Sequence, residues 1–211
     1  MTSPKPGQLV ALEGIDGSGK STLAKSLVRA LRARGLAAVA RREPADRALG
    51  RLAQEAGHRD AWTGAVYFTI DRFLARPALE RDLTRAKFVV TDRSFYSTLA
   101  YQGSALGAEG VRKIRELSAR ATVEPDHVIL LDLPPAVAVA RLGRRGASRG
   151  PLERRRTLDR VARRYRELAR QERWLVLDAR RPTAELTQAV LEHLRVTRGT
   201  VRKRRTGRTR T

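Results

Sequence analysis

The stretch EGIDGSGKST, from Glu13 to Thr22, combines the residue types that bind a chain of phosphates. Gly14, Gly19, Lys20 and Ser21 have the spacing Gly-x4-Gly-Lys-Ser, between an apolar stretch and an amphipathic one. Glycines allow backbone N–H groups to turn inward as an anion-binding nest, and a helix starting near Lys20 points its positive end there. Lys20 would reach the β- and γ-phosphates of a nucleoside triphosphate, and the Ser21 hydroxyl could bind Mg²⁺. The predicted nucleotide-binding residues are Gly14, Ile15, Asp16, Gly17, Ser18, Gly19, Lys20, Ser21 and Thr22.

Five short apolar stretches predict the strands that must hold this loop in place. Most are apolar almost throughout, which is typical of strands buried on both faces and therefore of a parallel sheet. Helical periodicity fills the intervals between them, so we expect an α/β domain of the P-loop NTPase type, in which helices flank a five-stranded parallel sheet in three layers. Ligands of such domains bind at the carboxyl ends of the strands. The predicted strands are Gln8–Gly14, Leu36–Ala40, Lys87–Asp92, His127–Asp132 and Trp174–Asp178.

Apolar residues at helical spacing predict where three of the helices lie. One helix carries Leu23 to Leu31 and ends by Gly35, and a second carries Leu49 to Ala56 and ends before Gly57. A third begins at Pro182. We expect one kinase domain over residues 1–196, followed by a basic tail, residues 197–211, that has no periodicity and is expected to be disordered.

Composition sets limits on the class of protein. The net charge is +22, and seven of those charges lie in the last fifteen residues. The excess elsewhere is spread out, so nucleic-acid binding is expected only non-specifically, through the tail. The chain has no cysteine, which excludes disulfides and thiolate metal sites. No apolar run is long enough for a membrane span, and the first residues, MTSPKPGQ, form no hydrophobic signal segment, so we expect a cytoplasmic protein.

The third predicted strand continues into TDRSFYSTLAYQG, from Thr91 to Gly103, and here the chain resembles the thymidylate kinases. Those enzymes transfer the γ-phosphate of ATP to dTMP. A chain of 211 residues without an Asn-Lys-x-Asp motif already favours a nucleotide-scale kinase among P-loop proteins. The resemblance extends from Leu9 to about Leu194. Its further motifs are RREP (Arg41–Pro44), YFTIDRF (Tyr67–Phe73), LLDLPPAVAVARLGRRG (Leu130–Gly146), RYREL (Arg164–Leu168) and WLVLDARRPTAEL (Trp174–Leu186).

Two arginines follow predicted strands beside the P-loop, and guanidinium groups suit phosphate oxygens. These are Arg42 and Arg93, which the resemblance assigns to the dTMP phosphate. Asp92, at the end of a strand near Ser21, could hold Mg²⁺ through water. The resemblance implies ATP with Mg²⁺ as donor and a homodimer as assembly. It implies a catalytic set of Lys20, Asp16, Arg93 and Arg149, a metal pair of Ser21 and Asp92, and a dTMP-binding set of Asp16, Arg42, Phe68, Arg72, Arg93, Ser97, Thr98, Tyr101 and Gln102.

The base pocket in that set has a helical spacing of its own. Phe68 and Arg72 are four residues apart, so they share one face of a helix. The resemblance makes Phe68 the stacking partner of thymine and Arg72 a donor to its O4. Thr98 and Gln102 would contact the base edge, and Tyr101 would lie under the C2′ of the sugar and disfavour a ribose.

A predicted mobile lid spans Gly143 to Arg156, where glycine, serine and proline interrupt two helices. Because Gly17 leaves the P-loop without an arginine, the resemblance implies that the lid supplies one, with Arg145 and Arg149 as candidates. The chain departs from the family pattern at Ala45 and Asp46, where a Gly-Gly pair is usual, and at Ser94, where the pattern has an aromatic residue. The three histidines, His58, His127 and His193, are expected to form no cluster.

Two alternatives stay open at this point. The first is a P-loop kinase with another acceptor, such as dUMP, a nucleoside or a modified nucleotide. The second, from another class, is a nucleic-acid-associated NTP-binding protein that uses the basic tail as an arm.

Overall fold

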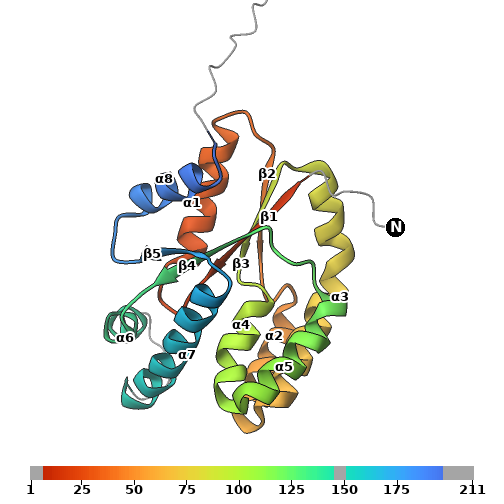
Figure 1. The fold of residues 1–211 in the computed structure, drawn as a ribbon, viewed down its shortest axis with the longest axis vertical. Coiled ribbons are helices and arrows are strands. Elements are labelled where there is room, and N and C mark those ends of the chain that lie inside the picture. The colour runs from red at the N-terminus through yellow and green to blue at the C-terminus, as the bar shows by residue number, and fades with distance from the viewer. Residues whose placement is uncertain (1–6, 145–150, 197–211) are drawn as a thin grey trace, which may run out of the picture.

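The computed structural model describes residues 7–144 and 151–196, and it contains a five-stranded parallel sheet (Figure 1). The strands run in the order β2-β3-β1-β4-β5, so the first strand lies at the centre. This confirms the predicted α/β class and the number of strands. The strands are β1 (Gln8–Glu13), β2 (Ala38–Arg42), β3 (Phe88–Asp92), β4 (His127–Asp132) and β5 (Leu175–Asp178).

The predicted position of β2 was wrong by two residues. The apolar run Leu36–Ala40 suggested that the strand ends at Ala40, but β2 is Ala38–Arg42, and Arg42 pairs with Asp92 of β3. Since β2 lies at the edge of the sheet, each of its residues after Ala38 is at least partly exposed, and two arginines can belong to the strand. Wholly apolar runs are typical of central strands, which are buried on both faces, so they do not mark the end of an edge strand such as β2.

Helices cover both faces of the sheet (Figure 1). On one face α1 packs against α8, and on the other lie α3, α4, α5 and α7, as right-handed crossovers between parallel strands require. The helices are α1 (Lys20–Arg32), α2 (Arg47–Arg59), α3 (Ala61–Arg85), α4 (Phe95–Tyr101), α5 (Gly103–Ala121), α6 (Pro135–Gly143), α7 (Pro151–Gln171) and α8 (Thr183–His193). Within the described ranges, no helix is both long and apolar enough to cross a membrane.

One helix boundary differs from expectation. Gly57 does not end the second helix, because α2 continues to Arg59 and Asp60 then serves as the boundary between α2 and α3. The Asp60 carboxylate accepts hydrogen bonds from the N–H groups of Trp62 and Thr63 and so caps α3. Gly57 instead lies where α2 crosses α3, next to Gly64. A glycine that allows two helices to approach was mistaken for a helix terminator.

The hydrophobic core lies on both sides of the three central strands. Val10, Ala11 and Leu12 of β1 are fully buried and join α1, α4, α7 and α8 in one cluster. Two of the three histidines meet, since the rings of His127 and His193 pack edge to face with centroids 5.3 Å apart. Burial and the neighbouring His193 lower the pKa of His127, which fits a structural pair between β4 and α8.

The predicted lid coincides only in part with described residues. Gly143 is the last residue of α6, and residues 151–156 already belong to α7. Arg145, Arg149 and the basic tail, residues 197–211, lie outside the described residues.

The close contact between α2 and α3 gives a prediction. A Cβ atom at Gly64 would lie 2.6 Å from the Cα of Gly57, so Gly64→Ala must push the two helices apart. We expect the free energy of unfolding in denaturant to fall by about 1–2 kcal/mol, because overpacking outweighs the gain in helix propensity.

The matched control is Gly57→Ala. A Cβ there would meet its neighbours at 3.5 Å, an ordinary van der Waals distance. This variant should be neutral, or more stable by up to about 1 kcal/mol. Equal losses in the two variants would contradict the packing argument.

Candidate active site

The P-loop follows a path that two glycines make possible. Gly14 has φ +141°, and a Cβ there would lie 2.6 Å from the carbonyl oxygen of Leu131 in β4. Gly17 has φ +85°, and its Cβ would lie 3.2 Å from the carbonyl oxygen of Ala138 in α6. The loop is therefore enclosed by β4 and α6 and leads directly into α1, whose first residue is Lys20.

Lys20 lies buried over the loop that contains it. Its Nζ donates hydrogen bonds to the carbonyl oxygens of Gly14 and Ile15, both at 2.9 Å, and to Ser18 Oγ at 3.3 Å. Burial and the charge of Arg93 lower the pKa of Lys20 to about 8. Phosphate oxygens, which carry full negative charge, would replace these carbonyls as stronger acceptors for the same ammonium group.

Ser21 and Asp92 meet beside the loop. Ser21 Oγ donates a short hydrogen bond to Asp92 Oδ2, while Asp92 Oδ1 is buried without a hydrogen-bond partner. A hydroxyl next to an orphaned carboxylate oxygen suits Mg²⁺, which takes one or two protein oxygens and completes its shell with phosphate and water. Among the residues the structure describes, no group of three or more His, Cys, Asp or Glu side chains could hold a metal ion. The residues therefore fit a nucleotide-bound Mg²⁺.

Asp16 of the P-loop forms an ion pair with Arg93, which follows β3. Burial opposes the ionisation of Asp16, but the charges of Arg93 and Lys20 outweigh it and lower its pKa. The N–H of Asp16 donates to Tyr101 Oη at 3.0 Å, and the Arg93 guanidinium lies 5.2 Å from the centre of the Tyr101 ring. Arg93 has φ +82°, a conformation rarely adopted by residues other than glycine and frequent at functional sites.

Arg72 lies buried on α3 and is held from two sides. Its Nε donates to Glu43 Oε2 at 2.6 Å, and its Nη2 donates to Thr98 Oγ1 at 2.8 Å and to the Ser94 carbonyl oxygen at 3.2 Å. Its Nη1 is buried without a partner. Burial raises the pKa of Glu43 even though Arg72 opposes the shift. An orphaned guanidinium N–H in an otherwise satisfied group is a donor that a ligand can use.

The turn after β2 is held by a carboxylate. Asp71 of α3 is buried, and its two oxygens accept the N–H groups of Ala45 and Asp46, each at 2.8 Å. The Asp46 side chain in turn accepts the N–H groups of Ala48 and Leu49 and caps α2. The two residues that replace the expected Gly-Gly pair are thus fixed through their backbone.

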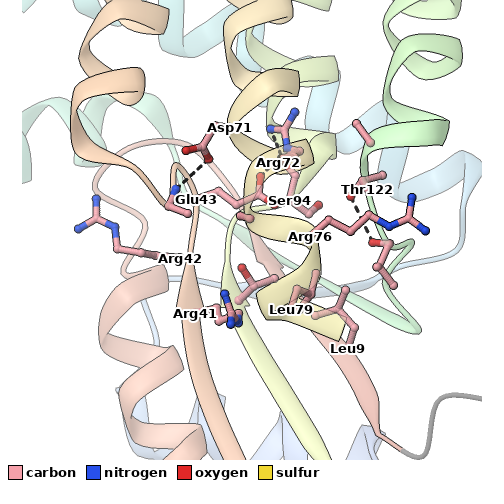
Figure 2. Close-up of a pocket in the computed structure, with 15 residues that line it drawn as sticks. Leu9, Arg41, Arg42, Glu43, Asp71, Arg72, Arg76, Leu79, Ser94 and Thr122 are labelled. Atoms are coloured by element: carbon pink, nitrogen blue, oxygen red, sulfur yellow. Dashed lines mark hydrogen bonds and ion pairs between the residues drawn. The ribbon is translucent and has the colours of Figure 1, made fainter. Parts of the chain in front are cut away.

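A pocket lies beneath this turn, between β2, α3 and the end of α5 (Figure 2). Glu43 and Arg72 lie at one end of it, and Leu9 and Leu79 at the other. Arg41 is held by Asp82 at 2.7 Å. Arg42 projects from β2 in another direction and is exposed, with no hydrogen bond or ion pair to any described residue. Of the three arginines predicted to bind the acceptor, Arg42 alone has a guanidinium without a partner in these ranges.

A family model described as thymidylate kinase matches residues 12–190. This chain belongs to the thymidylate kinase family. The "Thymidylate kinase" of Rhizorhabdus wittichii is 38% identical over 208 residues, covering 90% of this chain and 97% of the relative. The "Probable thymidylate kinase" of Sulfurisphaera tokodaii is 34% identical over 186 residues (88% and 94%). The "Thymidylate kinase" of Desulfovibrio desulfuricans is 37% identical over 201 residues (84% and 90%).

Membership confirms the predicted enzyme class. Thymidylate kinases are ATP-dependent phosphotransferases of the nucleoside monophosphate kinase type, and both alternatives are disfavoured by the match over most of the chain.

The remaining residues predicted for the site lie on α3 and α4 or directly after α4. Ser97 and Thr98 are buried on α4, where they contact Arg93 and Arg72. Gln102 follows α4 and is half-buried. Phe68 lies on α3 one turn before Arg72, half-buried and outside both hydrophobic clusters of the described chain. A stacking role is therefore easier to reconcile with its position than plain core packing.

Two residues of the site were missed at the sequence level. Glu13 is fully buried at the end of β1, and Tyr165 of α7 reaches it across the site at 2.8 Å. A charged residue that ends an otherwise apolar strand was a signal for Glu13. Tyr165 gave no local signal beyond its place in the RYREL motif.

The lowered pKa of Lys20 predicts how nucleotide binding depends on pH. Phosphate favours the charged ammonium, so ATP binding must be accompanied by proton uptake once Lys20 is neutral in the free protein. We expect the affinity for ATP to be nearly constant below pH 8 and to fall toward about tenfold per pH unit above it. Titration calorimetry in buffers of different ionisation enthalpy should detect uptake of a proton at pH 9 and almost none at pH 7.

The control is Lys20→Arg, since a guanidinium stays charged throughout this range. This variant should bind ATP more weakly than the native protein, and its binding of ATP at pH 9 should take up no proton. An unchanged affinity of the native protein between pH 7 and pH 9 would contradict the lowered pKa.

Proposed function

We propose that this chain transfers the γ-phosphate of ATP to dTMP, giving ADP and dTDP. The observation that carries the proposal is the ion pair between Asp16 and Arg93. It joins the loop that would hold the donor phosphates to the end of β3, where the acceptor phosphate would lie. A phosphoryl transferase needs these two sites side by side, with positive charge between them.

On the donor side, the N–H groups of Gly14 to Thr22 would surround the phosphates and Lys20 would bind the β- and γ-oxygens. Ser21 and Asp92 would hold Mg²⁺, directly or through water. The ion would offset the charge that develops on the phosphates. Arg149, expected from the lid, remains a proposed further donor of positive charge.

On the acceptor side, Arg42 and Arg93 would bind the phosphate of dTMP, with Ser97 supporting Arg93 from α4. Asp16 and Tyr101 would face the deoxyribose. Arg42 is exposed and unpaired within the described residues. Arg93 is paired with Asp16, so its guanidinium would either leave Asp16 for the incoming phosphate or bind both at once. The Arg93 guanidinium is already held by Asp16 and Ser97, so it would lose little entropy on binding.

The unpartnered Nη1 of Arg72 would donate to O4 of thymine, and Phe68 would stack on the ring. Thr98 and Gln102 would contact the base edge. A buried donor with no protein acceptor favours a carbonyl oxygen at that position over an amino group. This is the basis on which we expect thymine to be preferred over cytosine.

The homodimer implied by the family also remains a proposal. Ile70, Phe73 and Leu74 are exposed on the side of α3 opposite Phe68, and Leu74 exposes 65% of its surface. A second copy that covered these side chains would remove an unusual apolar surface from water. The single domain over residues 1–196 and the cytoplasmic location stay predictions from the sequence.

An acceptor panel tests the function. With MgATP, the protein should release ADP rapidly with dTMP and much more slowly with dCMP, dGMP or AMP, because among these acceptors only dTMP is a pyrimidine that presents a carbonyl oxygen, O4, to the donor of Arg72. Coupled detection of ADP gives the rates. Lys20→Ala is the control for a contaminating kinase and should abolish turnover while leaving the folded protein intact. Turnover with another acceptor at a higher kcat/KM than with dTMP would refute the proposal.

Removing the stacking surface should weaken acceptor binding without affecting the donor side. Phe68→Ala is expected to raise the KM for dTMP by about 5- to 150-fold, which corresponds to a stacking contribution of about 1–3 kcal/mol. The KM for ATP should change little. Steady-state kinetics with each substrate varied in turn separates the two effects.

Trp62→Ala is the matched control, since it removes an aromatic ring from the first turn of the same helix. It should leave the KM for dTMP within about twofold of the native value. A twofold change corresponds to about 0.5 kcal/mol, the size of the effect expected from a substitution at the surface. A similar rise in both variants would mean that α3 was disturbed as a whole.

A further inference from the structure

Glu13 is a fully buried carboxylate to which the proposed reaction assigns no part. Its Oε1 accepts hydrogen bonds from the N–H and the hydroxyl of Ser94, both at 2.7 Å. Its Oε2 accepts from Ser97 Oγ at 2.7 Å and from Tyr165 Oη at 2.8 Å. No basic side chain of the described chain forms an ion pair with it, and its four hydrogen bonds all come from neutral donors. Burying a carboxylate in this way is costly unless every lone pair is used, as it is here.

One branch of this network fixes the backbone on either side of Arg93. That residue has φ +82°, which costs free energy for any side chain beyond glycine. Its own N–H donates to the Leu12 carbonyl oxygen at 3.1 Å, and its carbonyl oxygen accepts from Thr91 Oγ1 at 2.8 Å. The N–H of Ser94 completes the set by donating to Glu13. Without the Glu13 carboxylate, the N–H of Ser94 would lose its hydrogen-bond acceptor. The strained backbone of Arg93 would then lose one of the hydrogen bonds that stabilise it.

A second branch reaches the side chains that face the substrates. Ser97 Oγ accepts from Arg93 Nη1 at 3.1 Å and donates to Glu13, so the carboxylate orients the guanidinium through one hydroxyl. The Tyr165 ring packs edge to face against Tyr101, whose hydroxyl accepts the N–H of Asp16. Burial and the charge of Glu13 raise the pKa of Tyr165, so its hydroxyl stays a donor.

We propose that Glu13, with Tyr165 as its partner, is a positioning residue that holds Arg93 in the left-handed conformation required to bind the acceptor phosphate. Its effect on catalysis rests on the proposed dTMP kinase function, whereas its effect on Arg93 does not. Glu13 itself touches no substrate and acts through Ser94, Ser97 and Tyr165.

The first test is kinetic. Glu13→Gln keeps the size of the side chain but loses the charge and one acceptor oxygen. We expect kcat/KM for dTMP to fall by about 10- to 100-fold, because a misplaced guanidinium of this kind commonly costs that much. The dissociation constant of ATP, measured without acceptor, should change by less than about threefold, since the Glu13 carboxylate accepts its hydrogen bonds from Ser94, Ser97 and Tyr165 and not from the P-loop.

Glu172→Gln is the matched control. Glu172 also accepts a hydrogen bond from a buried tyrosine, Tyr96, at 3.0 Å, but it leads to Arg115 on α5 and not to the site. Its replacement should leave kcat/KM for dTMP unchanged. Equal effects of the two substitutions would overturn the positioning role.

The second test does not depend on activity. Arg93→Gly and Arg93→Ala both remove the guanidinium, but only glycine adopts φ +82° without strain. Glu13→Gln should lower the melting temperature by about 3–10 °C in the native protein and in the Arg93→Ala background, and by less than half of that in the Arg93→Gly background. The same loss in both backgrounds would show that Glu13 stabilises the fold without holding Arg93, and would overturn the proposal.

The two tests separate the possible failures. If the native protein does not phosphorylate dTMP, the proposed function fails and the melting comparison still decides the role of Glu13. If Glu13→Gln does not fold, Tyr165→Phe replaces it, with Tyr96→Phe as its control. Tyr165→Phe should lower kcat/KM for dTMP by about threefold or more through the loss of one hydrogen bond to the carboxylate. No difference between these two variants would count against the proposal.

Discussion

The site depends on the parallel pairing of β1 with β3. In this register Leu12 lies beside Asp92, so the chain leaves both strands at the same edge of the sheet. The P-loop therefore begins at the end of the strand next to the one that ends at Asp92. The N–H of Arg93 donates to the Leu12 carbonyl oxygen and joins the two strand ends. A shift of one residue would point Asp92 away from Ser21 and turn every buried side chain of β3 to the opposite face. The buried apolar residues of both strands therefore fix the geometry of the charges.

Those charges are arranged in pairs before any substrate binds. Arg93 contacts Asp16, Arg72 contacts Glu43, and the Lys20 ammonium contacts backbone carbonyls. In a chain with a net charge of +22, the carboxylates of Asp16 and Glu43 hold the two arginines in place and limit the mutual repulsion of the cations. In the proposed reaction a phosphate would compete with the Asp16 carboxylate for Arg93, which would reduce the gain from binding but keep the guanidinium aligned.

The sequence predicted those parts of the site that depend on neighbouring residues. The P-loop, the central strands and the shared helical face of Phe68 and Arg72 all follow from short patterns. The edge strand β2 was misplaced, because partial exposure lets Arg41 and Arg42 belong to it. The network around Glu13 could not be predicted, since its donors Ser94, Ser97 and Tyr165 are 81, 84 and 152 residues away along the chain.

The same distinction explains why a departure from the family pattern is tolerated after Pro44. The carboxylate of Asp71 binds the N–H groups of Ala45 and Asp46, which every residue except proline possesses. The turn therefore keeps its support when the Gly-Gly pair is replaced, provided that the new residues accept its backbone angles. Arg72 is one residue further along α3, and the role proposed for it depends on its own side chain. A turn that is held through its N–H groups can therefore change in sequence at little cost, whereas a donor such as the Arg72 guanidinium is lost with its side chain.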